Sequence, residues 1–292
     1  MVKHLAGKHE QKRHAGKSGP RTINTTASDA AKLEKLFNVV EQDGVKEGAH
    51  QLVNNYGLKT ARKILDFYQG REIAPGVCGQ IVLLRPEYDK KKLPTGRIYI
   101  ATSFIDGRGR EVGDCSRKFG GNEIEHVGMF LKPSYQNKGI ATRFVRDSED
   151  LYRAIGAKRV TLQAEQTIGG YAWATMGYDF ANKRSQDRIT RDAKELSKSL
   201  GLKLAIPKHA YEIAAMTIPY SSGMKKELNR RAKEYEDEWD ESADKLLDSC
   251  ISKGQFKFGK FLLLGSKWSA KKDLYNSTQV RIGNDLYNRL NH

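Results

Sequence analysis

The residues best suited to chemistry lie in one short turn, residues 133–142. Gln136, Gly139 and Ala141 form the pattern Q-x-x-G-x-A where a hydrophobic strand is expected to lead into a helix. Backbone N–H groups and the positive end of the helix dipole at such a turn can hold a pyrophosphate. Gly139 and Ala141 let phosphate oxygens approach the backbone, and Lys138 adds a cation. The turn therefore predicts an anion-binding site.

The elements around this turn have a recognisable order. Residues 124–132 are apolar and β-branched enough for a strand, and helical periodicity runs over 140–155, where Gly156 ends it. A second strand is predicted over 159–164. A strand, a turn, a helix and a strand make a βαβ unit, so the two strands should be parallel neighbours.

The chain before this unit shows a helical pattern followed by a strand pattern. Helical spacing after Ser28 predicts three short helices up to about residue 70, punctuated by Gly44 and Gly57. Strands are then predicted over 80–84 and 97–104, and with 124–132 they read as an antiparallel meander. The connecting segment 106–122 contains five glycines, so we expect a mobile loop there.

The C-terminal hundred residues carry no recognisable site chemistry. Helical spacing continues over 224–250, with seven acids between Glu234 and Asp244 that are expected to face solvent. Cys250 falls on the apolar face and is predicted to be buried. Phe256, Phe258 and residues 262–264 predict a strand pair, and 280–290 a closing helix.

Composition limits the class of protein. No run approaches 18 apolar residues and the first 26 lack an apolar stretch, which argues against a membrane span and a secretory signal. The three cysteines lie far apart without a C-x-x-C pair, which argues against a disulfide scaffold or a zinc site. These features predict a protein of a reducing cytoplasm, with no metal site.

The net charge of +16 is densest in residues 1–26, which hold six Lys/Arg and one acid. We interpret this segment as a flexible leader that is either simply solvated or docks on nucleic acid or another protein. The remaining excess is spread over the chain and interrupted by the acidic run. With no known base-reading motif, a plain nucleic-acid-binding protein is the weakest of the functions considered.

Residues 124–180 resemble the GNAT superfamily of N-acetyltransferases. The segment EHVGMFLKPSYQNKGIATRFVRDSEDLYRAIGAKRVTLQAE contains the four parts of the superfamily pattern in order: a strand ending in hydrophobic–x–Pro, R/Q-x-x-G-x-G/A, an amphipathic helix and a hydrophobic strand. The resemblance implies an α/β fold with a mixed sheet whose two central parallel strands splay apart, with acetyl-CoA in the gap. It assigns the pantetheine arm to the strand edge around Phe130 and Leu131. It assigns the pyrophosphate to backbone groups of Gln136, Asn137, Lys138, Gly139, Ile140, Ala141 and Thr142.

A narrower likeness covers other segments. GGYAWATMGYDF, at 169–180, and GKFLLLGSKW, at 259–268, look like GNAT-like domains encoded by bacteriophages and mobile elements. The leader run GKHEQKRHAGK is similar to leaders on phage proteins associated with heads or virions. This likeness implies a protein of the bacterial host cytoplasm or of the virion, with a capsid component or DNA as partner of the leader. The predicted helices over 28–70 match no family.

The resemblance also suggests catalytic groups. An amine must be neutral to attack, and a lysine side chain has a pKa of about 10.4, so such an enzyme usually supplies a base. Glu125 lies where the family's glutamate commonly lies, with Glu123 on the same face and His126 on the opposite one. The alternative is that Glu125 is a surface carboxylate paired with a lysine.

The expected acid is less clear. The family usually has a tyrosine four residues before the glycine of its last motif, where this chain has Trp173. An indole cannot protonate a thiolate. Tyr171 is the nearest alternative, although on a helix it would face about 200° away from Trp173. Failing Tyr171, solvent protonates the thiolate, or the protein binds CoA without turnover.

These observations predict four segments and two leading functions. The segments are a leader (1–26), N-terminal helices (27–72), a GNAT-like core (73–185) and a mainly helical extension with a terminal strand pair (186–292). The first function is an acetyl-CoA-dependent N-acetyltransferase acting on an amine, such as one on a protein. The second is a virion or head-associated structural or DNA-binding protein that retains the fold without turnover.

Overall fold

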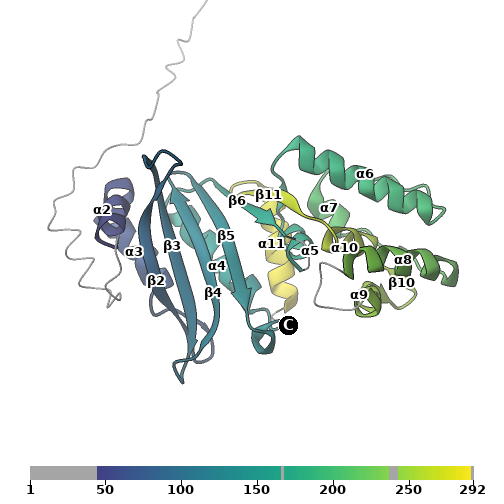
Figure 1. Ribbon diagram of the computed structural model, residues 1–292, viewed down its shortest axis with the longest axis horizontal. Helices are drawn as coiled ribbons and strands as arrows, with labels where there is room; N and C mark the ends of the chain where they lie inside the picture. Colours follow the sequence, from purple (N-terminus) through teal and green to yellow (C-terminus); the bar gives the residue numbers. More distant parts are fainter. Residues whose placement is uncertain (1–44, 166–167, 237–242, 291–292) are drawn as a thin grey trace, which may run out of the picture.

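The computed structural model describes residues 45–165, 168–236 and 243–290 of the chain. Its main feature is an eight-stranded sheet in the order β1-β2-β3-β4-β5-β6-β11-β7 (Figure 1). Only β5 and β6 run parallel in this sheet, and the other neighbouring strands are antiparallel. The strands are β1 (Glu72–Ala74), β2 (Val77–Tyr88), β3 (Pro94–Asp106), β4 (Glu111–Gly120), β5 (Glu123–Leu131), β6 (Arg159–Ala164), β7 (Asp179–Phe180) and β11 (Trp268–Asp273).

Three helices pack on the first strands of the sheet: α2 (Val45–Tyr56), α3 (Leu58–Tyr68) and α4 (Ile140–Ala154). Their apolar faces are buried because aromatic side chains from two helices and two strands meet edge to face with ring centroids 5.3–6.1 Å apart. These rings belong to Tyr68, Phe104, Phe119, Phe144 and Tyr152. The cluster fixes α4, and with it the turn before α4, against the sheet.

The C-terminal part is mainly helical, and α6 to α10 lie on the far side of β11 from β5 in Figure 1. Its helices are α5 (Ile168–Thr175), α6 (Lys183–Ser199), α7 (Ala210–Ala214), α8 (Lys225–Glu236), α9 (Ala243–Cys250), α10 (Phe258–Leu264) and α11 (Ser277–Leu290). A second sheet has the order β8-β10-β9, from Ile218–Pro219, Gln255–Phe256 and Ile251–Ser252. Single 3₁₀ turns occur at Pro133–Tyr135 and Ser222–Met224.

Much of the predicted element order is confirmed. The helices α2, α3 and α4, the βαβ unit and the closing helix α11 lie where the periodicity places them. Gly156 ends α4 with a positive φ of 83°, and Cys250 is buried as expected. The leader and the predicted helix after Ser28 lie outside the described residues.

The expectation of a mobile loop over 106–122 was wrong, because β4 occupies most of that segment. Val112, Cys115 and Phe119 point into the core, and β4 pairs with both β3 and β5. Two features hid this strand from the sequence pattern. Gly113 is packed so tightly that a Cβ atom there would lie 2.3 Å from the Phe130 carbonyl oxygen, and Arg117 is buried where an apolar residue is expected.

The predicted strand pair over 256–264 was also wrong. Phe256 lies in β10, but Phe258–Leu264 forms the helix α10, in which six residues are buried. Helix α10 packs closely on α7 because Gly259 has no side chain: a Cβ atom there would lie 1.6 Å from the Ile213 carbonyl oxygen. A short run that is apolar on every side has no periodicity to separate a helix from a strand.

Strand β11 was not predicted, and it ties the extension to the core. It pairs with β6 over six residues, from Trp268↔Ala164 to Asp273↔Arg159, and with β7 on its other edge. Lys272 of β11 reaches Glu149 of α4, with Nζ 3.0 and 2.8 Å from the two carboxylate oxygens. The boundary placed at residue 185 therefore divides one continuous sheet.

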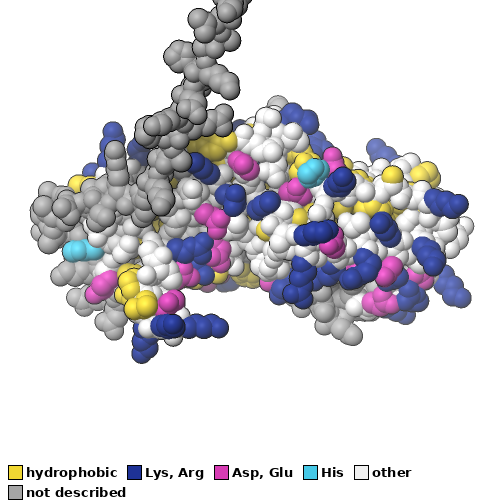
Figure 2. Space-filling model, turned by 90° about the horizontal axis from the view of Figure 1, so that it is seen from above, with side chains coloured by type: hydrophobic (Ala, Val, Ile, Leu, Met, Phe, Trp, Pro, Cys, Tyr) yellow, Lys and Arg dark blue, Asp and Glu magenta, His cyan; other side chains and the backbone are white. Residues whose placement is uncertain are grey.

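Charged side chains are dispersed over the described surface. Figure 2 shows Lys and Arg across this view of the molecule, with Asp and Glu among them. In the described part of the chain, no helix is long and apolar enough to cross a membrane.

Candidate functional site

The two parallel strands of the sheet separate partway along their length. β5 and β6 pair from Glu123↔Arg159 to His126↔Leu162, and the pairing then stops. The register of β5 against β4 shifts at the same point, so that Val127 forms a bulge. Residues 127–131 of β5 therefore have β4 on one side and no strand partner on the other. This divergence is the splay that the resemblance to the GNAT superfamily implied.

The free edge of β5 presents backbone groups of alternate residues. The Lys132 amide donates to the Val112 carbonyl of the β4 side, 2.9 Å away, and the Phe130 carbonyl also faces β4. Because alternate residues of a strand face opposite edges, the amides of Met129 and Leu131 face away from β4, into the splay. Beside this edge, Val127 and Phe130 are 45% and 52% exposed.

The turn that follows β5 leads straight into α4. The Gln136 side chain donates to the Leu131 carbonyl at 2.6 Å and so ties the turn to the end of the strand. Asn137 and Gly139 have positive φ angles of 58° and 71°. Gly139 caps α4 without a side-chain hydrogen bond, which leaves the N–H groups of the first turn open to a ligand. Lys138 lies over the Tyr135 ring, 5.8 Å from its centroid.

These placements agree with the geometry expected for the turn. Ile140 is buried and anchors the helix start, whereas Ala141 and Thr142 are partly exposed in the first turn. The free edge of β5 and the first turn of α4 are two sets of backbone donors joined by the turn 132–139. Their role in binding a ligand stays a prediction.

Glu125 belongs to a charged network on the face of the sheet opposite α4. Its carboxylate lies 2.8 Å from Arg97 Nη1 and 3.5 Å from Lys118 Nζ. Glu123 shares Arg97, at 3.2 Å. The alternative of a paired surface carboxylate is therefore observed as geometry, with Arg97 and Lys118 as its partners. The role of Glu125 as a base stays a prediction.

His126 points to the other face, as the strand alternation predicts. Its Nε2 lies 3.1 Å from the hydroxyl of Tyr152, which lies 2.9 Å from that of Tyr68. Burial, aided by the positive charges of Arg117 and Lys272, lowers the pKa of His126 well below its ordinary value. His126 is therefore a neutral core residue at pH 7.

Trp173 and Tyr171 face different surroundings. The Trp173 ring packs on His126 of β5, with centroids 5.7 Å apart, and on Tyr178, at 5.0 Å. Tyr171 instead lies near the extension, with Lys260 Nζ 6.0 Å from its ring centroid. Burial raises the pKa of Tyr171, and the nearby Cys250 contributes a smaller increase. The helix thus turns the tryptophan toward β5 and the tyrosine toward α10, so these contacts do not bring Tyr171 together with Glu125.

Two residues near the splay were missed by sequence reasoning. The feature of interest at Met129 is its backbone amide, which the residue type does not reveal. Arg117 is fully buried beneath the bulge and donates to the Gly128 carbonyl at 2.7 Å. One of three arginines in a segment with five glycines gave no signal, although recognising the strand would have placed Arg117 on the inner face.

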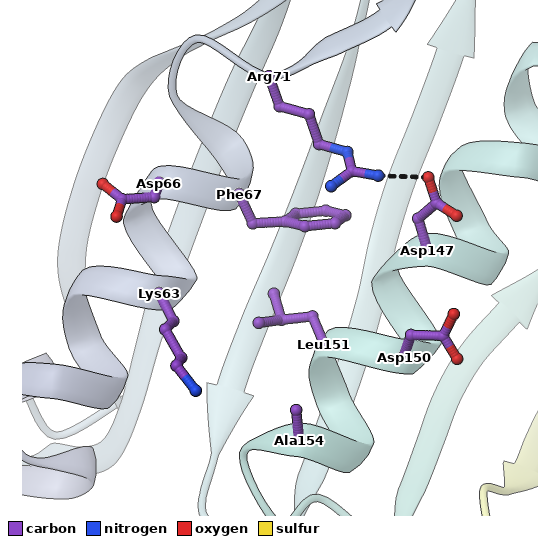
Figure 3. A pocket seen from close by; sticks show the side chains of 8 residues that line it. All are labelled: Lys63, Asp66, Phe67, Arg71, Asp147, Asp150, Leu151 and Ala154. Atoms are coloured by element: carbon purple, nitrogen blue, oxygen red, sulfur yellow. Dashed lines mark hydrogen bonds and ion pairs between the residues drawn. The ribbon is translucent and has the colours of Figure 1, made fainter.

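A separate groove of about 510 Å³ lies between α3 and α4. Figure 3 shows Phe67 and Leu151 at its floor, with Arg71 reaching across to Asp147. Arg71 also stacks on Phe67, 4.5 Å from the ring centroid. Its acidic residues are engaged in ion pairs, Asp66 with Arg62 and Asp147 with Arg71. The groove belongs to the helix layer and is not lined by the free edge of β5.

Residues 85–175 match the family model described as Acetyltransferase (GNAT) family. This range runs from β2 to α5 and includes the splay and the turn before α4. Residues 85–175 are therefore similar to the GNAT acetyltransferase family, and the mixed α/β fold with splayed parallel strands is GNAT-like. A comparison with curated proteins found no match.

Several solved acetyltransferase structures are similar over part of their length. An acetyltransferase from Bacillus cereus ATCC 14579 shows 10% identity over 23% of this chain and 48% of its own, with a TM-score of 0.21. The chain thus spans less than half of that relative. An aminoglycoside 6′-N-acetyltransferase from Enterococcus faecium shows 14% identity over 60% of this chain and 73% of its own, with a TM-score of 0.25. A spermidine N-acetyltransferase chimera from Vibrio cholerae shows 8% identity over 86% and 92%, with a TM-score of 0.22.

Proposed function

We propose that this chain, with its GNAT acetyltransferase segment, transfers an acetyl group from acetyl-CoA to an amine, such as one on a protein. One observation carries the proposal: the free edge of β5 leads directly into the open first turn of α4. A long ligand with an anionic end and an amide-bearing arm matches these two sets of donors.

The residues present fit acetyl-CoA from end to end. The N–H groups of the first turn of α4, with Lys138 beside them, suit the pyrophosphate. The amides of the β5 edge suit the amides of the pantetheine arm, as an added strand would pair with them. Val127 and Phe130 give that arm exposed apolar side chains to lie against.

Acetyl-CoA supplies the acetyl group as a thioester, which an amine nitrogen attacks to form an amide while the thiolate leaves and a proton moves from nitrogen to sulfur. The Met129 amide faces the splay and can donate to the carbonyl oxygen, where negative charge develops. Loss of one such donor typically costs about 10²–10³ in kcat. The bulge at Val127 sets the direction of this amide.

Glu125 is the proposed base. Arg97 and Lys118 orient its carboxylate through ion pairs, and in the proposed reaction it accepts a proton from the amine through a water molecule. Tyr171 remains the proposed acid only if α5 shifts, because it contacts the extension in this structure. Otherwise solvent protonates the thiolate.

Titration calorimetry with acetyl-CoA tests the binding site. Gly139→Asp would place a carboxylate among the proposed phosphate donors and should abolish binding. Gly201→Asp is the matched control, because Gly201 has a φ of 70° against 71° for Gly139 and lies at the end of α6, outside the proposed site. Absence of binding to the wild type at millimolar acetyl-CoA, or equal loss in both variants, would reject the proposal.

A second function is favoured by Trp173. Its indole occupies the position beside β5 and cannot protonate a thiolate, which suits a phage head or virion protein that keeps the fold without turnover. Acetylation of a cell lysate by the wild type, compared with Glu125→Gln, separates the two functions. Binding of acetyl-CoA without any transfer would favour the structural protein.

The leader has a separate test. We expect deletion of residues 1–26 to abolish salt-sensitive binding to DNA or to capsid particles. Unchanged binding would refute a docking role for the leader. The phage origin and both partners of the leader stay predictions.

A further inference from the structure

Arg117 is a fully buried cation without an acidic partner. It lies in the middle of β4 with 0% of its surface exposed, and in the described part of the chain its guanidinium makes no ion pair with a carboxylate. Its neighbours Cys115, Tyr68 and Tyr152 are neutral groups at pH 7. Burying an ion costs several kcal/mol, so this position calls for a compensating role.

Arg117 contacts the bulge of β5 with both terminal nitrogens, and its guanidinium also interacts with the Tyr152 hydroxyl of α4. Nη1 donates to the carbonyls of Ser116, at 2.8 Å, and Gly128, at 2.7 Å. Nη2 lies 4.0 Å from the Met129 sulfur, and Nε has no hydrogen-bond partner among the described residues. The charge therefore sits directly behind the peptide bond that joins Gly128 to Met129.

This peptide bond connects the buried arginine to the free edge of β5. In a trans peptide the carbonyl and the N–H point in opposite directions. The Gly128 carbonyl points back to Arg117, so the Met129 N–H points into the splay. A hydrogen bond accepted by a peptide carbonyl polarises the unit and strengthens the bond that its N–H donates. An ionised donor has the larger effect.

We propose that Arg117 is a positioning residue that aims and polarises the Met129 amide, so that this amide becomes the strongest donor to the thioester carbonyl. The proposal rests on the proposed function for the ligand, but the polarisation is a property of the protein alone. It also explains why a cation is retained in the core: its charge acts on the reacting carbonyl through one peptide unit.

The first test needs no ligand. The chain has five methionines, so ¹⁵N-methionine labelling gives a sparse amide spectrum in which Met129→Leu identifies the Met129 peak. Removing the cation in Arg117→Met, which adds one methionine peak that Met129→Leu in the same variant separates from that of Met129, should move the Met129 amide proton upfield, and Arg117→Lys should recover part of the shift. Arg117→Gln is a second neutral variant with a polar side chain, in case Arg117→Met does not fold.

Tyr68→Phe is the matched control for core disturbance. It removes a hydroxyl from the same cluster, bonded to Tyr152 at 2.9 Å, and leaves the contact between Arg117 and Gly128 in place. The Met129 peak should stay in place in this variant. An unmoved peak in the neutral Arg117 variants, or an equal movement in Tyr68→Phe, would overturn the proposal.

The second test measures the chemical shift of the ligand's carbonyl carbon. Acetyl-CoA labelled with ¹³C at the carbonyl should show a downfield shift on binding to the wild type, and Arg117→Met should lose most of that shift at saturating ligand. Tyr68→Phe should retain it. A bound carbonyl with the chemical shift of free acetyl-CoA in the wild type would overturn the proposal without any variant.

The two tests distinguish the failure of this inference from that of the proposed function. If acetyl-CoA does not bind, the proposed function fails, and the Met129 amide still decides whether Arg117 polarises the peptide. If acetyl-CoA binds and is turned over while the carbonyl shift is independent of Arg117, the function stands and this inference fails.

Discussion

Replacing Lys272 by methionine should strongly destabilise the protein. Lys272 and Glu149 have side chains that are 3% and 6% exposed, and Nζ contacts both carboxylate oxygens and the Met176 carbonyl, 2.8 Å away. After Lys272→Met the buried carboxylate loses this cation and keeps its hydrogen bond from the Tyr178 hydroxyl, 3.2 Å away. Breaking a buried ion pair from one side costs about 3–5 kcal/mol.

This cost can be measured by urea unfolding followed by tryptophan fluorescence. With an m value of about 3 kcal/mol/M, the midpoint should fall by about 1–2 M. Lys271→Met is the matched control, because Lys271 lies on the opposite face of the same strand and is partly exposed, and it should shift the midpoint by less than about 0.3 M.

A double variant separates the buried charge from the lost packing. Lys272→Met with Glu149→Gln removes both charges, while the glutamine can still accept a bond from Tyr178, so the double variant should be more stable than Lys272→Met alone. Equal midpoints for Lys272→Met and Lys271→Met, or a double variant less stable than Lys272→Met alone, would refute the reasoning.

Three further outcomes are expected. Glu125→Gln should lower kcat for acetyl transfer by about 10²–10⁴ with little change in acetyl-CoA affinity, whereas unchanged kcat would remove it as the base. Because burial lowers the pKa of His126 in the folded state, wild-type stability should fall as pH drops below about 6.5, where unfolded histidine gains a proton. His126→Asn should lose less stability between pH 7 and pH 5, and parallel melting curves would contradict this. A native thiol titration should label Cys78 alone, because Cys115 and Cys250 are buried, and burial raises the pKa of Cys115 to about 11. Rapid labelling of all three would contradict the fold.

The βαβ unit could be predicted from sequence because its signals are local. The apolar period of α4, the glycine that ends it and the β-branched strand β6 each act within a few residues. Strand β4 and helix α10 could not be predicted in this way. β4 depends on a buried arginine and on Gly113, whose bare Cα admits the Phe130 carbonyl, and α10 depends on the contact of Gly259 with α7.

The candidate site divides in the same manner. The turn before α4 was predicted because Gln136 and Gly139 carry a recognisable spacing, and Gln136 does tie the turn to β5. The surroundings of Tyr171 and Arg117 were not predicted. They depend on contacts between elements that lie far apart in the sequence. Tyr171 lies beside Lys260 of α10, and Arg117 lies beside the bulge in β5.

The place of β11 between β6 and β7 has a consequence for how the chain is made. On the ribosome, β6 emerges long before Trp268, so one edge of this parallel strand stays open while the whole extension is synthesised. An open edge is a template for pairing with another chain. The nascent protein therefore passes through an interval in which this edge is exposed, and the interval ends only when β11 has been made. Synthesis of Trp268–Asp273, and not completion of residues 85–175, is what allows the sheet to close.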